Sequence, residues 1–279
     1  MRSRIVAIFL LLCLFAGPLP AKEPGVGPAL YNVLSDDDEA AFGRAAAARL
    51  AREMPMLDDP VIDAYLGAVG GDLAKHSWRN NITYHFRVID SPQINSFALP
   101  GGYIYVTRGL LDFLQSESEL SGVLAHEISH IVAHHGSDEL SRQLIAAKLA
   151  TQGARLVGVS DDSALKMLNT VGGPVVAFVQ HPLNQAQELE ADRLGVYNMY
   201  RAGWDPHGYQ RALERYRDSG NSGGLLSALL ANHPPVLVRI EAVKLEIVDV
   251  GNTNNLLNDS IFFQAAKARM LLLPPPKGK

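Results

Sequence analysis

The residues best suited to chemistry are two histidines and a glutamate in the pattern His-Glu-x-x-His. They are His126, Glu127 and His130. On a helix, residues four positions apart lie one above the other on the same face. Two imidazoles arranged in this way can bind one Zn²⁺ ion at about 2.0–2.1 Å each. Glu127 flanks that face and can take a proton from a water molecule, so the motif predicts a zinc site with its own general base.

The segment around the motif has the features of a buried helix. Ser116 and Glu119 form a capping-box pattern at its start. We expect Gly136 to end it in a left-handed conformation. Apolar residues occupy most of its circumference, which is typical of a core helix. The three polar side chains would then be buried and need partners, and a metal ion supplies one.

A catalytic zinc ion needs a third protein ligand, and two glutamates compete for that role. The helix face through Glu188 carries small or apolar residues and Asp192, as expected where two helices pack closely. The face through Glu190 looks solvated; its other residues are Arg193, Leu194, Tyr197 and Arg201. We therefore expect Glu188 to bind zinc and Asp192 to accept the far N–H of a ligand histidine.

Two alternatives stay open at this point. His134 lies one turn beyond His130 and is a weaker ligand candidate, because a histidine there also suits the negative end of the helix dipole. Glu188 and Asp192 could instead form a buried ion pair with an arginine.

The helix and strand signals of the segments that must position these residues predict an α+β protein, which is mainly helical and has a small sheet. Strands are expected near 82–88, 94–99 and 103–107, and helices at 36–54, 60–76, 139–157, 185–203, 206–218, 233–247 and 261–273. The second strand contains Ser96, Phe97, Ala98 and Leu99. Its free edge could bind an extended peptide substrate, although an ordinary hairpin explains the pattern equally well. No internal repeat is visible, so we expect a single domain over 35–279 that ends in a proline-rich tail.

Composition and the N-terminus narrow the class of protein. The chain has 279 residues and a net charge of -4, which gives no electrostatic case for nucleic acid. Arg2 and Arg4 precede an apolar run over 5–17, and cleavage is expected after Ala21, so 1–21 is predicted to be a signal peptide and 22–34 a linker. An uncleaved membrane anchor is the alternative. The only cysteine, Cys13, lies in that run, so histidine and carboxylate must bind the zinc.

Several motifs in order resemble the CAAX-protease-like zinc metallopeptidases, which are gluzincins numbered family 48. They are HEISH, then ELEADRLG with Glu188 and Asp192, then His233-Pro-Pro with Arg239, together with 95–102 and 202–206. No later run is long enough to span a membrane, so the soluble periplasmic branch, BepA-like and LoiP-like, is the most similar. Two features differ from that branch: the chain ends without helical repeats, and Gln185 stands where an arginine is expected.

The resemblance implies a zincin-like fold and a zinc endopeptidase with one zinc ion per chain. His126, His130 and Glu188 would be the ligands and Glu127 the base, and His233 would lie on a loop that can close over the zinc. The reaction itself also needs a group that stabilises the oxyanion; Arg239, Tyr103 and His233 are the candidates, Arg239 and Tyr103 also for structural support, and the sequence does not choose among them. The substrates would be misfolded or outer-membrane proteins in the periplasm. The protein itself would contact the outer-membrane assembly machinery and the membrane surface.

Two rival functions remain. In one, the protein is a non-proteolytic periplasmic chaperone or assembly factor, with a structural zinc ion closed off by a fourth ligand, His233. In the other, it is a different zinc hydrolase, such as an amidase of cell-wall peptides.

Overall fold

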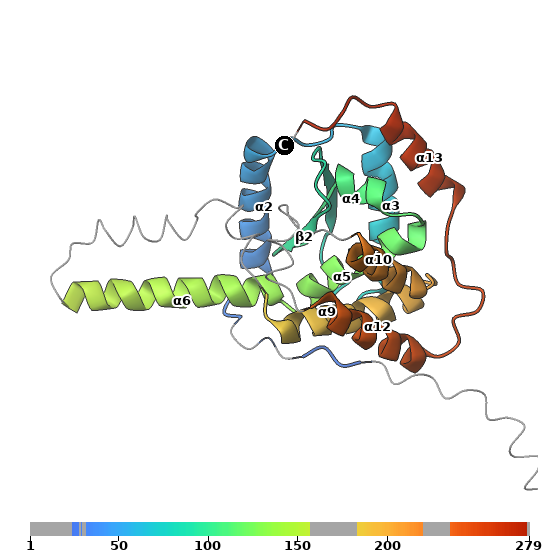
Figure 1. The fold of residues 1–279 in the computed structure, drawn as a ribbon. Helices are drawn as coiled ribbons and strands as arrows, with labels where there is room; N and C mark the ends of the chain where they lie inside the picture. The colour runs from blue at the N-terminus through green and yellow to red at the C-terminus, as the bar shows by residue number, and fades with distance from the viewer. Residues whose placement is uncertain (1–23, 28, 30–31, 157–182, 220–234, 278–279) are drawn as a thin grey trace, which may run out of the picture.

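The computed structural model describes residues 24–27, 29, 32–156, 183–219 and 235–277, and Figure 1 shows the path of the chain. The expected signal peptide, the segment 160–180 and His233 lie outside these residues. Within them, the chain is mainly helical with a small three-stranded mixed sheet, which confirms the α+β prediction.

The sheet consists of β1 (His85–Ile89), β2 (Ser96–Leu99) and β3 (Tyr103–Thr107). Its order is β1-β3-β2, with β1 parallel and β2 antiparallel to β3. The last two strands therefore form a hairpin, and β2 also lies at one edge of the sheet, so the structure is compatible with both interpretations of this segment. Because successive side chains in a strand point to opposite faces, the sheet has two apolar faces to cover.

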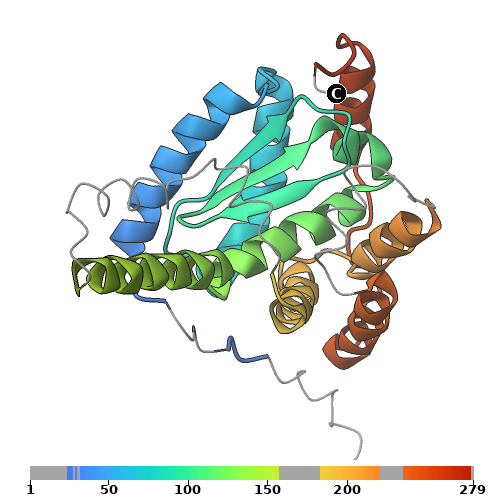
Figure 2. The same cartoon turned by 60° about the vertical axis from the view of Figure 1, so that its left-hand side comes forward.

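Helices cover both faces of the sheet (Figure 2). On one face, Ala46 and Leu50 of α2 (Asp36–Glu53) pack with Ile89, Leu99 and Tyr105. On the other face, α3 (Pro60–His76) and α5 (Glu117–Val132) pack against residues that include Phe86, Val88, Ile104 and Val106. At the start of α3, the Asp59 side chain accepts the backbone N–H groups of Val61 and Ile62. At the start of α5, Ser116 accepts the N–H of Glu119 as the capping-box pattern predicts, but the Glu119 carboxylate bonds to the N–H of Gln115.

The helix α5 is the centre of the structure. Almost all of its residues are buried, because β2 and α3 lie on one side and two later helices on the other. These are α9 (Gln185–Arg201) and α10 (His207–Asp218). Gly195 allows α9 to approach closely, since a Cβ there would lie 3.3 Å from the backbone nitrogen of His126. This close packing brings the predicted third ligand next to the histidine pair.

The remaining helices surround this centre. A short α4 (Arg108–Phe113), which the sequence analysis did not predict, follows β3. The helix α12 (Val236–Val250) packs on α9 and α10, and α13 (Ile261–Leu271) packs on α3. The helix α6 (His135–Leu156) projects from the body, as Figure 1 shows. Of the described helices, none combines the length and hydrophobicity needed to cross a membrane.

The predicted end of α5 was wrong. The left-handed residue is His134, with φ of 58°, and Gly136 instead lies in the first turn of α6. Histidine is one of the non-glycine residues that adopt a positive φ most often, and Nδ1 of His134 lies 2.8 Å from a carboxylate oxygen of Glu39. The chain therefore turns within one residue and starts a new helix at His135, four residues before the expected start at Glu139.

One face of α9 was also predicted incorrectly. Leu194 and Tyr197, which were expected on a solvated face, are buried at 0% and 3% exposure. They contribute to the main apolar core, because further helices pack on that side of α9 as well.

Candidate active site

The helix α5 brings His126 and His130 together, as their spacing predicts. Their Nε2 atoms are 3.0 Å apart, and both rings are buried. Ser116 helps fix the start of this helix by accepting the backbone N–H of Glu119. The carboxylate of Glu119 in turn accepts the N–H of Gln115 at 2.8 Å. The two imidazoles therefore project from a well-capped helix into the interior.

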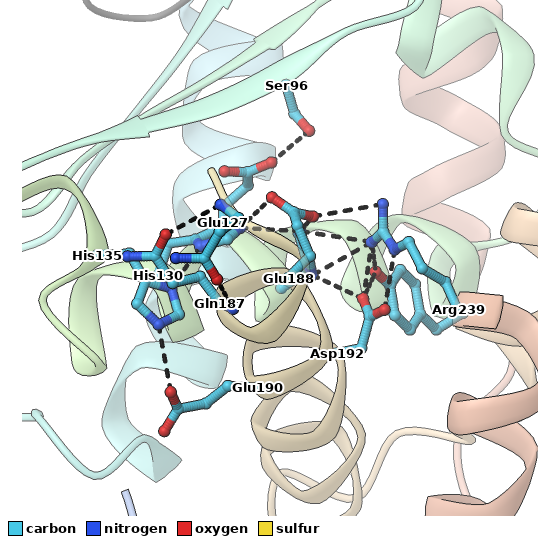
Figure 3. Close-up of polar contacts among 12 residues, drawn as sticks. Ser96, Glu127, His130, His135, Gln187, Glu188, Glu190, Asp192 and Arg239 are labelled. Carbon is cyan, nitrogen blue, oxygen red and sulfur yellow. Dashed lines mark hydrogen bonds and ion pairs between the residues drawn. The ribbon is translucent and has the colours of Figure 1, made fainter. Parts of the chain in front are cut away.

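The helix α9 supplies the third side chain, Glu188, which lies in its first turn (Figure 3). Asn184 caps this helix together with Gln187, in a capping box. The Glu188 carboxylate is fully buried, and its oxygens lie 3.5 Å from His126 Nε2 and 3.6 Å from His130 Nε2.

The three side chains have the separations that a tetrahedral metal ion requires. Two ligand atoms at about 2.0–2.1 Å from such an ion lie about 3.3 Å from each other. The two Nε2 atoms are 3.0 Å apart, Glu188 Oε2 lies 3.5 Å from His126 Nε2, and Glu188 Oε1 lies 3.6 Å from His130 Nε2, so each histidine approaches a different carboxylate oxygen. We call these three side chains the triangle. Two imidazole nitrogens and a carboxylate are also the donor set that a catalytic zinc ion prefers. The residues present therefore fit a zinc ion.

Charge balance favours the same conclusion. Glu127, Glu188 and Asp192 are buried close to one another, with the buried guanidinium of Arg239 beside them. When the three carboxylates are ionised and the histidines are neutral, as metal binding requires, the carboxylates carry three negative charges and Arg239 carries one positive charge. Buried charge of this kind is costly unless paired, and a divalent cation would balance it.

The outer nitrogen of His126 contacts Asp192, as the sequence analysis predicted. The distance from Nδ1 to Oδ1 is 2.9 Å. Asp192 also accepts hydrogen bonds from Arg239 at 2.7 and 2.8 Å and from the hydroxyl of Tyr209 at 2.6 Å. These contacts fix the orientation of the ring, which is how a carboxylate outside the ligand shell supports a metal-binding histidine.

The same contacts shift the pKa values of this pair. Burial and the charge of Arg239 lower the pKa of His126, but its contacts with Asp192 and Glu188 outweigh them and raise it to about 9. Burial raises the pKa of Asp192, but Arg239 and His126 outweigh it and hold that pKa well below its usual range. Asp192 is therefore an anion, and a metal ion would displace a proton from His126.

The outer nitrogen of His130 has a different partner, which sequence reasoning missed. His130 Nδ1 lies 2.8 Å from Nδ1 of His135, and His135 Nε2 lies 3.4 Å from a carboxylate oxygen of Glu190. Glu190 also accepts the backbone N–H of Gly27 at 2.7 Å. Its pKa is lowered, chiefly by the hydrogen bond with His135. A chain of contacts thus runs from the N-terminal segment to the second histidine.

Glu127 lies between the histidine pair and the sheet edge. Its Oε1 accepts a hydrogen bond of 2.7 Å from the hydroxyl of Ser96 in β2 (Figure 3). This contact aims the carboxylate and places the edge strand directly beside it.

The other predicted site residues lie in different places. Phe97 stacks on Tyr105, and Leu99 is buried under α2, so within β2 it is Ser96 that contacts Glu127. Tyr103 stacks on His85 and is not among the residues brought to the histidine pair. His134 contacts Glu39 rather than the triangle. Arg239 reaches the site and donates to Asp192, a contact that favours structural support over oxyanion binding.

Comparison with known proteins identifies a match to one protein family. The model of peptidase family M48 matches residues 60–247. The beta-barrel assembly-enhancing protease of Yersinia pestis is 29% identical over 225 residues, which cover 78% of this chain and 46% of that protein. The protein of the same name from Escherichia coli K12 is 28% identical over 258 residues, covering 89% of this chain and 51% of the relative.

A further relative is the mitochondrial metalloendopeptidase OMA1 of Arabidopsis thaliana, which is 29% identical over 184 residues, or 66% of this chain and 36% of that protein. The chain spans about half the length of the two beta-barrel assembly-enhancing proteases. The family match covers most of the chain and includes every residue of the triangle. The resemblance inferred from the sequence is therefore confirmed, and the chain belongs to peptidase family M48.

Proposed function

We propose that this protein is a zinc-dependent endopeptidase that hydrolyses misfolded or outer-membrane proteins in the periplasm. The observation that carries the proposal is the position of Glu127 beside the triangle of His126, His130 and Glu188, with its carboxylate held by Ser96. Membership of a metallopeptidase family supports the reaction type.

His126, His130 and Glu188 would hold one zinc ion per chain. When bound, zinc would supply a Lewis acid that polarises the carbonyl of the peptide bond. Glu127 takes a proton from the attacking water and passes it to the amine nitrogen of the leaving group. Ser96 holds the Glu127 carboxylate during both transfers, through the 2.7 Å hydrogen bond to Oε1. Asp192, with Arg239 behind it, holds His126 in one orientation.

The free edge of β2 is suited to holding the substrate backbone. An extended peptide can add to an exposed edge through main-chain hydrogen bonds, and β2 is an edge strand whose first residue touches the base. An added strand would therefore pass directly over Glu127. Such binding requires an unfolded or extended segment, which fits misfolded proteins as substrates.

Two observations support the location and the substrate. The N-terminal pattern of Arg2, Arg4 and the following apolar run predicts secretion. Two relatives are named for enhancing β-barrel assembly, which supports outer-membrane proteins as substrates and their assembly machinery as a partner.

The test compares wild type with Glu127→Gln. Both proteins should retain one zinc ion by elemental analysis, and only the wild type should cleave an unfolded outer-membrane β-barrel protein and casein. Glu241→Gln, a change at an exposed glutamate of α12, should cleave like the wild type.

Equal behaviour of wild type and Glu127→Gln would rule out the endopeptidase and favour the chaperone with a structural zinc ion. Release of fragments from purified peptidoglycan, with casein left intact, would identify an amidase instead.

A further inference from the structure

The helix α13 has a second apolar face, which points away from the molecule. Figure 1 shows this helix at the outer edge of the structure. Its inner face packs on α3 and α4, and the residues buried there are Phe263, Ala266 and Met270. A surface helix normally carries polar residues on its other side. On α13 and its C-cap, however, large apolar residues are exposed there by 67–83%; they are Ile261, Phe262, Leu271 and Leu272.

The two cationic residues of α13 are turned towards the protein itself. Lys267 Nζ donates to the carbonyl oxygens of Asp112 and Leu114, at 2.6 and 2.8 Å. Arg269 Nη2 lies 2.8 Å from a carboxylate oxygen of Asp59. A helix that lies on a membrane instead presents Lys and Arg to the lipid head groups. The charges of α13 therefore favour an apolar protein surface over an anionic membrane as the partner.

Both ends of α13 are fixed, so its outer face is presented rigidly. At the start, the Ser260 hydroxyl accepts the N–H groups of Phe262 and Phe263, at 3.1 and 3.3 Å. At the end, the buried guanidinium of Arg108 donates to the carbonyl oxygen of Met270 at 2.8 Å. Binding to a surface that is already ordered loses little conformational entropy.

The order of residues on the outer face is the same in both directions. Ile261, Ala265, Ala268 and Leu272 follow one another at spacings of four, three and four residues, so they form one line along the helix. Both alanines are exposed. If a second copy lies antiparallel across this line, Ile261 meets the partner's Leu272 and Ala265 meets the partner's Ala268. The small alanines at the centre then let the two helices approach closely.

The exposed area is large enough for two copies to bind each other. The four large residues are 67–83% exposed, and together they present on the order of 500 Å² of apolar surface, near the upper end for a monomer. Two such faces bury on the order of 1,000 Å² in total, which is about the minimum for a specific interface.

We propose that α13 is the interface of a homodimer, in which the outer faces of two copies pack antiparallel about a two-fold axis. Two-fold dimers of this kind use the same surface on both copies. An interface of this size corresponds to a Kd on the order of 10 µM. The inference does not depend on the proposed reaction, because no residue of α13 belongs to the candidate active site.

The first experiment measures the mass of the purified protein by sedimentation equilibrium, from about 1 to 100 µM. The wild type should change from one chain to two over this range. Ala265→Glu places a charge at the centre of the interface and should raise the Kd at least tenfold, while circular dichroism shows that the variant folds. Leu245→Glu is the matched control, because Leu245 is 71% exposed on α12, and its Kd should equal that of the wild type.

The second experiment tests the antiparallel arrangement by disulfide formation. Cys13 is the only cysteine of the chain, so Cys13→Ser gives a background without thiols. Ile261→Cys and Leu272→Cys are made separately in this background, marked by tags of different size, mixed and oxidised. The mixture should form a cross-linked dimer that contains one copy of each variant. Neither variant alone should cross-link, because its two cysteines lie about 16 Å apart along the helices, too far for a disulfide.

Three results would overturn the proposal. The first is a wild type that stays monomeric at every concentration; binding of this monomer to vesicles of anionic lipid would then assign the face to a membrane. The second is a dimer that Leu245→Glu weakens and Ala265→Glu does not, which would place the interface elsewhere. The third is cross-linking of Ile261→Cys alone, which would show that the helices do not pair antiparallel.

Discussion

Replacing Asp192 by asparagine removes the one carboxylate that joins His126, Arg239 and Tyr209. The substitution keeps the size of the side chain and removes its charge. In the wild type, Asp192 is 1% exposed and lies 2.9 Å from His126 Nδ1. We expect Asp192→Asn to weaken zinc binding and to destabilise the protein, through two different contacts.

The contact with His126 determines the effect on the metal. Loss of such a partner behind a ligand histidine lowers metal affinity by about 10- to 100-fold, which is about 1.4–2.7 kcal/mol. The contact with Arg239 determines the effect on stability, because the guanidinium stays buried and loses its main anion. Breaking a buried pair costs about 3–5 kcal/mol. Glu188 remains 3.5 Å from Arg239 Nη1, so we expect the lower end, about 3 kcal/mol.

Zinc affinity is measured by competition with a chromophoric chelator, and the free energy of unfolding by denaturant titration of the metal-free protein. Asp59→Asn is the control, since Asp59 is also buried but caps α3 and pairs with Arg269, away from the triangle. It should lower stability without changing zinc affinity. An unchanged zinc Kd in folded Asp192→Asn, or an equal loss in Asp59→Asn, would refute the role assigned to Asp192.

Three further predictions concern acid stability, the second histidine and helix packing. Burial raises the pKa of Glu39, but hydrogen bonds from His134 and Ser137 and the charge of Arg79 hold it at about 2, below the ordinary 4.5. The ionised Glu39 side chain therefore stabilises the protein fully above about pH 4.5, and this stabilisation is lost as the pH falls towards about 2. In denaturant titrations over this range, the free energy of unfolding of the wild type should fall by about 3 kcal/mol more than that of Glu39→Gln. His135→Phe should lower zinc affinity about 10- to 100-fold in chelator competition, and His135→Gln, which can still bond to its neighbour, should restore part of it. Gly122→Ala should lower the free energy of unfolding by about 1–3 kcal/mol despite the better helix propensity of alanine, because the added Cβ would lie 2.5 Å from Tyr209 Cβ. A rise in the thermal unfolding temperature of this variant would contradict the prediction.

Much of this site could be predicted because its signals are local. Helix spacing was enough to bring His126 and His130 together. The choice of Glu188 over Glu190 followed from the small and apolar residues on one face of α9, and the structure places Glu188 at the triangle. The starts of α2, α3, α9 and α13 were predicted for the same reason, since an N-cap such as Asp59 depends on a few neighbouring residues. The starts of α6 and α12 were placed four residues too late and three residues too early, respectively.

The missed residues depend on contacts between distant segments. His135 meets His130 only because His134 turns the backbone with a positive φ, and the sequence placed that turn at Gly136 instead. Glu190 was assigned to solvent because its neighbours are charged, yet it bonds to His135 and to Gly27, far away in the chain. Tyr209 lies on a helix that was predicted, but the packing of that helix on α5 was not.

Three acidic residues of α9 serve three different places within about one and a half turns. Glu188 faces the triangle, Asp192 holds one histidine, and Glu190 reaches the other through His135. A small tilt of this single helix would withdraw a ligand and loosen both rings in the same movement. We therefore expect the ligand Glu188 and the supports of both histidines to be lost together rather than one after another. A change in the position of α9 would then switch metal binding, and with it catalysis, on or off.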